Sequence, residues 1–226
     1  MNVVDIFGEK TKRTQRRNIL LGDPGKRHNN DLYSTPPVAT YALHVHGDPP
    51  ERILEPAAGR GWMANELIRC GHEVFAYDKY VDLDAPSWIG TQDFLTSSHD
   101  GRAEGVVTNP PFKSGLPMRF AELALSRYPY VALFCRLTFL ESYMRRSLFE
   151  RYPLNTMLIF SGRVNFTENR FNEKAGQCGG MVSYAWFIWD RRPRLSIIPS
   201  GFVRHVHVDT DGLYEAWRAE TSNKVI

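Results

Sequence analysis

Two segments of this 226-residue chain combine residue types that could bind and orient a ligand. The first, Glu55-Pro56-Ala57-Ala58-Gly59-Arg60-Gly61, follows a short apolar run and precedes a stretch with helical spacing. Glycine lets the backbone approach a ligand closely, so this segment is typical of a loop that binds a nucleoside. Asp78 ends the next apolar run, where a carboxylate could accept both hydroxyls of a ribose. An ordinary turn with a solvated Asp78 would look the same, so this pair alone identifies no function.

The second segment, Asn109-Pro110-Pro111-Phe112, is more specific. Two consecutive prolines remove two backbone donors and fix a rigid, projecting turn after a buried strand. The Asn109 side-chain oxygen and the Pro110 carbonyl can then accept the two hydrogens of a primary amine or amide. Phe112 offers a flat face on which an aromatic ring can stack. The alternative is a purely structural turn with a packed Phe112.

The elements that position these segments follow from the apolar pattern after residue 51. Strands are expected over 52–54, 73–78, 88–91, 103–108, 130–135, 155–160 and 182–189, with two more near 195–198 and 202–208. Helices are expected over 62–70, 117–127 and 141–150. This alternation predicts an α/β fold, with a mostly parallel sheet and helices on both faces. Because ligands bind at the carboxyl ends of such strands, we expect residues 55–61, Asp78, Asp93 and 109–112 to share one site.

Composition, cysteines and histidines exclude several classes of protein and of binding site. Hydrophobic residues make up 42% and charged residues 23% of the chain, which excludes a long disordered or fibrous protein. Three widely separated cysteines predict neither a disulfide framework nor a zinc site. The pairs His44/His46 and His205/His207 are interpreted as surface or helix residues, so no metal is expected. No apolar run approaches the length of a membrane span and no secretory signal is visible, so a cytoplasmic location is expected.

Together the two segments resemble class I S-adenosylmethionine-dependent methyltransferases that modify the amino group of adenine in DNA. Residues 55–61 resemble the cofactor loop of that family, and Asn109–Phe112 resembles its catalytic tetrapeptide. Thr35-Pro36 is similar to the segment that contacts the methionine carboxylate, and Asp93-Phe94 to the pair that hydrogen-bonds and stacks the cofactor adenine. The resemblance implies a cofactor site formed by Thr35, Pro36, Glu55, Pro56, Ala57, Gly59, Gly61, Asp78, Asp93, Phe94 and Asn109.

The activity that the resemblance implies is direct transfer of a methyl group from S-adenosylmethionine to the N6 amine of adenine in DNA. Asn109, Pro110, Pro111 and Phe112 would form the catalytic turn, with the base flipped out of the duplex and stacked on Phe112. Phe166 resembles the aromatic residue placed against the flipped base, although it could equally pack on the core. Arg163 could contact phosphate or could be solvated.

The resemblance also suggests how the chain is divided. Residues 1–30 are rich in Lys and Arg and are expected to form a basic, flexible arm. Residues 31–190 would be a single catalytic domain with a loop insertion at 161–180, and residues 191–226 a C-terminal extension. We expect no large target-recognition domain between residues 61 and 109 or after residue 190. A net charge of +3 permits a nucleic-acid partner without requiring one.

Three other functions remain open. Methyltransferases of adenine in RNA and of glutamine in proteins also present a primary amine or amide to such a turn. The motif of the glutamine-modifying group is Asn-Pro-Pro-Tyr, whereas this chain has Phe112 in the last position. An inactive methyltransferase fold that only binds nucleic acid is the third alternative, and the intact residues at every motif disfavour it.

Overall fold

The computed structural model describes residues 34–81, 83–98, 101–113, 115–162, 182–193 and 203–222. The basic arm at 1–30, nearly all of the 161–180 loop and the strand expected near 195–198 lie outside these ranges. Both segments with candidate ligand-binding residues, 55–61 and 109–112, lie inside them.

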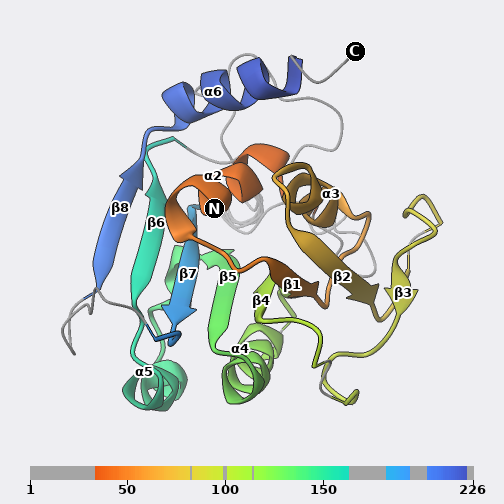
Figure 1. The fold of residues 1–226 in the computed structure, drawn as a ribbon. Coiled ribbons are helices and arrows are strands. Elements are labelled where there is room, and N and C mark those ends of the chain that lie inside the picture. The colour runs from red at the N-terminus through yellow and green to blue at the C-terminus, as the bar shows by residue number, and fades with distance from the viewer. Residues whose placement is uncertain are drawn as a thin grey trace, which may run out of the picture. The chain divides into compact units, whose positions relative to one another are not determined.

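An eight-stranded sheet forms the centre of the fold, in the order β3-β2-β1-β4-β5-β7-β6-β8 (Figure 1). Its strands are β1 (Arg52–Glu55), β2 (Glu73–Asp78), β3 (Gly90–Thr91), β4 (Gly105–Thr108), β5 (Tyr130–Arg136), β6 (Thr156–Phe160), β7 (Tyr184–Asp190) and β8 (Arg204–Val208). β7 is antiparallel to both of its neighbours, β5 and β6, and every other pairing among the described strands is parallel. The expected mostly parallel α/β sheet is thus confirmed.

Helices cover both faces of this sheet. α2 (Pro37–Gly47), α3 (Trp62–Arg69) and α6 (Thr210–Ser222) pack on one face, where Leu43, Leu67 and Leu213 join one apolar cluster. α4 (Leu116–Arg127) and α5 (Arg146–Arg151) pack on the other, where Leu125 and Leu148 join a second cluster. Two short 3₁₀ turns, η2 (Leu137–Phe139) and η3 (Tyr143–Arg145), lie between β5 and α5.

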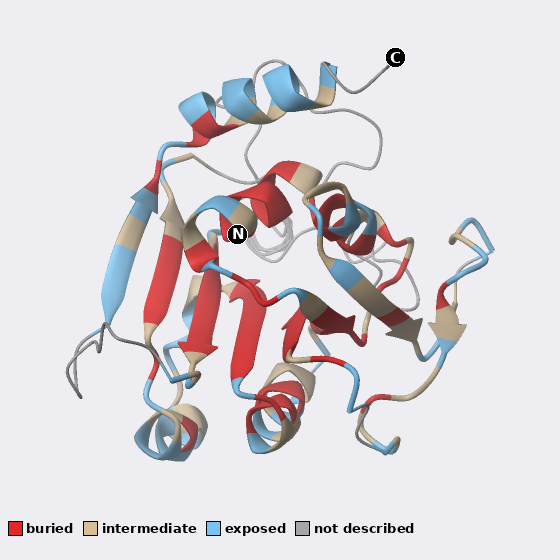
Figure 2. Ribbon diagram, viewed as in Figure 1, coloured by how far each residue is buried: buried red, intermediate tan, exposed pale blue. Residues whose placement is uncertain are grey.

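The central strand β5 explains why the expected parallel sheet needs cover on both sides. Alternate side chains of a strand point to opposite faces. Leu133 and Cys135 accordingly enter the cluster under α4 and α5, whereas Ala132 and Phe134 enter the cluster under α2. Buried residues are concentrated in the central strands, while β8 and the outer face of α6 are mostly exposed (Figure 2).

Some elements differ from the sequence-based expectation. The helix expected over 141–150 consists of η3 followed by the short α5, because residues 140 and 141 close the turn that ends η2. The strand expected over 88–91 is limited to Gly90–Thr91. Neither α2 nor α6 was predicted. The strand expected near 202–208 is confirmed as β8, which pairs with β6 and so extends the sheet.

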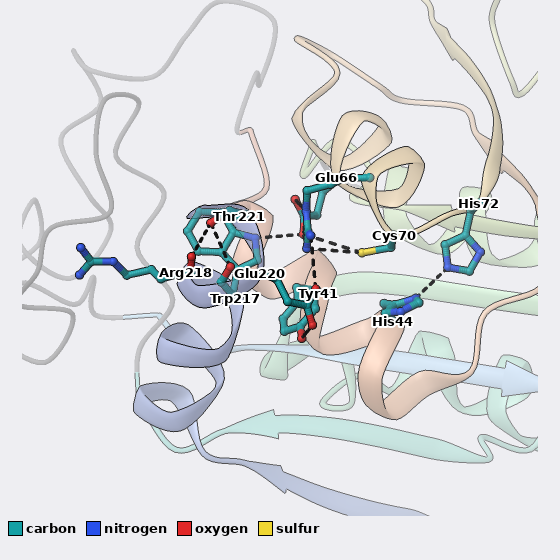
Figure 3. Close-up of polar contacts among 10 residues, drawn as sticks. Tyr41, His44, Glu66, Cys70, His72, Trp217, Arg218, Glu220 and Thr221 are labelled. Atoms are coloured by element: carbon teal, nitrogen blue, oxygen red, sulfur yellow. Dashed lines mark hydrogen bonds and ion pairs between the residues drawn. The ribbon is translucent and has the colours of Figure 1, made fainter. Parts of the chain in front are cut away.

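Polar side chains join α6 to α2 and α3 (Figure 3). Glu66 of α3 is 5% exposed and accepts a hydrogen bond from Trp217 Nε1 at 3.0 Å. The Arg69 guanidinium donates to both oxygens of the same carboxylate. Glu220 accepts from the hydroxyl of Tyr41 on α2. These contacts hold the C-terminal helix against the first half of the domain. No helix in the described residues is long and apolar enough to span a membrane.

Candidate active site

The loop between β1 and α3 turns sharply at two glycines. Gly59 has φ 54° and Gly61 has φ 77°, both in the left-handed region that glycine tolerates best. Gly61 is the N-cap of α3, and its N–H donates to the carbonyl of Ala58 at 2.7 Å. A Cβ at Gly61 would lie 2.8 Å from Ile89 Cδ1. Pro56 is buried and Ala57 half-buried in the same loop, so the segment predicted from sequence is a closely packed strand–turn–helix connection.

Asp78 connects this loop to the end of β2. Its Oδ2 accepts a hydrogen bond from Gly59 N at 2.8 Å, and its Oδ1 accepts one from Tyr80 N at 2.9 Å. Two predicted site residues, Gly59 and Asp78, are thus brought into direct contact. Each carboxylate oxygen can accept more than one hydrogen bond, so this arrangement still permits Asp78 to accept from a ligand hydroxyl.

Glu55 is a buried carboxyl group at the end of β1. It is 2% exposed, and its Oε2 has no hydrogen-bond partner among the described residues. Burial, and secondly the charge of Asp78, raise the pKa of Glu55 to about 8, while the backbone N–H of Ala64 acts in the opposite direction. A buried acceptor without a partner is costly, so this position fits a ligand that brings a donor or a positive charge.

The proline-rich turn meets the segment that precedes α2. Asn109 Nδ2 donates a hydrogen bond to Thr35 Oγ1 at 2.9 Å, across 74 positions of sequence. Thr35 is 3% exposed, and Pro36 is the N-cap of α2. In this bond the amide nitrogen of Asn109 is the donor. The amide oxygen of Asn109, which can only accept, is the side-chain atom that the bond does not use. Pro110 is buried, which fixes the turn against the end of β4.

Phe112 lies beside two residues that the sequence did not single out. Its ring centre is 5.8 Å from that of Tyr184, and the Arg136 guanidinium carbon lies 5.2 Å from it. Arg136 Nε donates to the Tyr184 hydroxyl at 3.4 Å, and Tyr184 stacks on Phe134. Arg136 ends β5 and Tyr184 begins β7, where the antiparallel register pairs them. Their position at strand ends was the available signal, but the pairing itself was not visible in the sequence.

The last predicted cofactor pair, Asp93-Phe94, is divided between surface and core. Asp93 accepts from Lys79 Nζ at 3.0 Å and from Leu95 N at 3.0 Å. The Lys79 ammonium holds the pKa of Asp93 below its usual range. The Phe94 ring is 5% exposed and packs on Phe120 at 5.1 Å between ring centres. Asp93, and not this ring, is the accessible member of the pair.

The remaining predicted residues lie elsewhere. Arg163 and Phe166 fall outside the described residues. His44 lies on α2 and its Nδ1 is 3.0 Å from His72 Nε2, while His205 and His207 lie on β8. In the ranges that the structure covers, no group of three or more His, Cys, Asp or Glu side chains could hold a metal ion.

Comparison with solved structures identifies the fold. A Listeria monocytogenes protein described as a class I S-adenosylmethionine-dependent methyltransferase superposes with a TM-score of 0.57 at 12% identity, over 95% of this chain and 78% of its own. The methyltransferase subunit of a type I restriction-modification system from Streptococcus thermophilus superposes with a TM-score of 0.52 at 12% identity, over 84% of this chain. This chain spans only 52% of that subunit. No protein-family model and no curated protein sequence matches the chain. The described residues therefore adopt the class I methyltransferase fold.

Proposed function

We propose that this protein transfers a methyl group from S-adenosylmethionine to the exocyclic N6 amine of adenine in DNA. The observation that carries the proposal is the hydrogen bond from Asn109 to Thr35. It joins the turn that resembles a catalytic tetrapeptide to the segment that resembles a cofactor contact, at the edge of a methyltransferase fold. The oxygen of the Asn109 amide would then serve as an acceptor, and Phe112 of the same turn would offer a stacking face.

The residues at the ends of β1 and β2 fit the proposed cofactor. S-adenosylmethionine supplies an electrophilic methyl group on a positively charged sulfur, so the protein needs only to bind and orient it. Glu55 offers a buried acceptor to the positively charged amino group of the methionine part of S-adenosylmethionine. Thr35-Pro36 would lie beside the carboxylate of that same part. Asp78 accepts from the ribose and Asp93 from the adenine amine. Glycine at positions 59 and 61 allows the positive φ angles with which this loop turns from β1 into α3, beside the proposed cofactor.

The turn that contains Asn109 would make the exocyclic amine of adenine, a poor nucleophile, more reactive. The lone pair of an aromatic amine is conjugated with its ring. When the Asn109 side-chain oxygen and the Pro110 carbonyl accept its two hydrogens, the nitrogen becomes more pyramidal and its lone pair points at the methyl group. The N–C bond forms as the C–S bond breaks, and the surplus proton of the amine is released to solvent. Catalysis is then positioning and electrostatic stabilisation.

The choice of DNA rests on the resemblance of the Asn109–Phe112 turn. One structural neighbour is described as a methyltransferase of a restriction-modification system, a description in keeping with a nucleic-acid substrate. RNA adenine and protein glutamine are the alternative acceptors, since each presents an NH₂ group to such a turn.

Transfer of a labelled methyl group tests the proposal. The protein is incubated with methyl-labelled S-adenosylmethionine and, in parallel, DNA, RNA or protein, and the labelled product is digested and identified. We expect N6-methyladenine from DNA. Asn109→Ala should lower the rate by about 100-fold, since it removes a preorganised polar contact. Asn65→Ala, at an exposed position of α3, is the matched control and should keep the parent rate. Methylcytosine, or label in protein alone, would contradict the proposal.

A further inference from the structure

Arg136 is a half-buried cation at the carboxyl end of β5, in contact with the candidate active site. Its Nε donates to the hydroxyl of Tyr184 at 3.4 Å, and its guanidinium carbon lies 5.2 Å from the centre of the Phe112 ring. Among the described residues this guanidinium makes no other hydrogen bond and no ion pair. Because a partly buried charge is costly unless it is paired, the position suits a ligand that brings a negative charge.

Other half-buried arginines of the chain have a counter-charge of their own. Arg69 pairs with Glu66 at 2.6 Å, and Arg192 pairs with Asp190 at 2.9 Å. Both lie away from the turn that contains Phe112, on α3 and directly after β7. Arg136 differs from them because its contacts in the described part of the chain are an aromatic ring and a neutral hydroxyl.

The order of the strands places Arg136 on the side of the site away from the proposed cofactor. β4 lies between β1, which ends at Glu55, and β5, which ends at Arg136 (Figure 1). β4 and β5 are parallel, so the turn that follows β4 and the end of β5 share one edge of the sheet. The proposed cofactor contacts at the ends of β1 and β2 lie on the other side of β4. An anion bound by Arg136 would therefore belong to the methyl acceptor.

The chemistry of the guanidinium indicates which anion this would be. A guanidinium presents its donors as a planar fork that fits the oxygens of a phosphate. A nucleotide carries its phosphate on the same sugar as its base, so a base stacked on Phe112 would bring a phosphate toward Arg136. A glutamine side chain is neutral and brings no such group. The contact between Arg136 and Phe112 thus favours a nucleotide over a protein amide as the acceptor.

We propose that Arg136 binds the phosphate next to the adenine held at Phe112, with the hydroxyl of Tyr184 orienting the guanidinium. The inference rests on the proposed function and adds to it the residue that fixes the backbone of the target nucleotide. Stacking on Phe112 orients the plane of the base, and a phosphate contact sets the position of the nucleotide along the strand. Two such contacts together hold the amine in place for transfer.

The test combines a change in the protein with the loss of one charge from the DNA. Arg136→Met keeps most of the length of the side chain and removes its charge. In a short DNA whose methylated adenine has been located, a neutral methylphosphonate linkage replaces the phosphate on the 5′ side or the 3′ side of that adenine. Arg136→Met, and one of the two neutral linkages, should each lower kcat/KM at least about tenfold, mainly through KM. Combined, they should cost no more than either alone, because both remove the same contact.

Two controls remove a charge elsewhere. Arg151 is exposed at the end of α5, ahead of the amino end of β6, and so lies toward the opposite edge of the sheet. Arg151→Met should keep the parent kcat/KM on the native DNA. A methylphosphonate remote from the target adenine should affect the parent and Arg136→Met equally.

The outcomes separate this inference from the proposed function. Losses that multiply when Arg136→Met is combined with either neutral linkage would overturn the phosphate contact and make Arg136 a support for the ring of Phe112. An unchanged kcat/KM for Arg136→Met would overturn it as well. In both cases N6-methyladenine formed by the parent in DNA leaves the proposed function standing. The same coupling on RNA, with no methylation of DNA, would keep the contact and overturn DNA as the substrate. A parent that methylates only protein overturns both.

Discussion

Glu55 shows how the fold acts on one ionisable side chain. The group is enclosed at the end of β1, near the carboxylate of Asp78, and both its burial and that charge raise the pKa to about 8 from the ordinary value of 4.5. In the unfolded chain Glu55 loses its proton near pH 4.5, whereas in the folded chain it keeps the proton until about pH 8. The folded state binds more protons across this window, so the contribution of Glu55 lowers stability as pH rises and levels off above the window.

We therefore expect Glu55→Gln to remove a fall in stability between about pH 5 and pH 8, because glutamine keeps the size of the side chain without an ionisable proton. The free energy of unfolding is measured in urea, without cofactor, at several pH values. Across the series the parent should lose stability relative to the variant as pH rises. Glu122→Gln, at an exposed position of α4, is the control and should keep the slope of the parent. Equal slopes for Glu55→Gln and the parent would show that Glu55 is already ionised in the fold.

At the level of elements, local pattern decided what could be predicted. The strands β1, β2, β4 and β5 and the helices α3 and α4 were predictable because their apolar residues recur with a regular period between turn residues. α2 was missed because residues 38–43 are buried without interruption, so the helix has no one-sided pattern. The placement of the candidate residues at the ends of β1, β2 and β4 was predictable because a parallel sheet brings these ends to one edge.

The loop before α3 gives a direct test of this reasoning. Gly61→Ala should destabilise the fold by more than about 2 kcal/mol, since positive φ alone costs a residue with a Cβ roughly 1–2 kcal/mol and the added atom would also meet Ile89. Gly71→Ala is the matched control. Gly71 has φ 97°, but a Cβ there meets no atom within 4 Å, so only the backbone term applies.

Denaturant midpoints of the two glycine variants give the difference due to the contact with Ile89. A Gly61→Ala protein as stable as Gly71→Ala would mean that the loop relaxes away from β3. The packing assigned to the cofactor loop would then be wrong.

At the level of the whole molecule, contacts between distant parts of the chain account for what the sequence did not reveal. Arg136 and Tyr184 meet because β7 runs antiparallel beside β5, and a strand's partner cannot be deduced from its own pattern. α6 has only Thr210 and Leu213 buried among its residues, so its sequence gives a weak apolar face. Besides its apolar contacts, α6 makes polar contacts with residues about 150 positions earlier, such as that between Trp217 and Glu66 (Figure 3).

Glu66 is the centre of these contacts, and its charge should therefore control how firmly α6 is held. Glu66→Gln keeps the size of the side chain but leaves Arg69, 19% exposed, without its buried counter-charge. We expect a loss of about 3 kcal/mol in the free energy of unfolding. The substitution should also increase the rate of hydrogen exchange in α6, relative to the parent, and leave the rate in β5 nearly unchanged. Glu150→Gln removes the exposed partner of Arg146 and should change neither measurement, since both of those side chains are largely solvated. If Glu66→Gln lowers stability while α6 keeps its protection from exchange, the network stabilises α3 alone, and α6 is held by its apolar contacts.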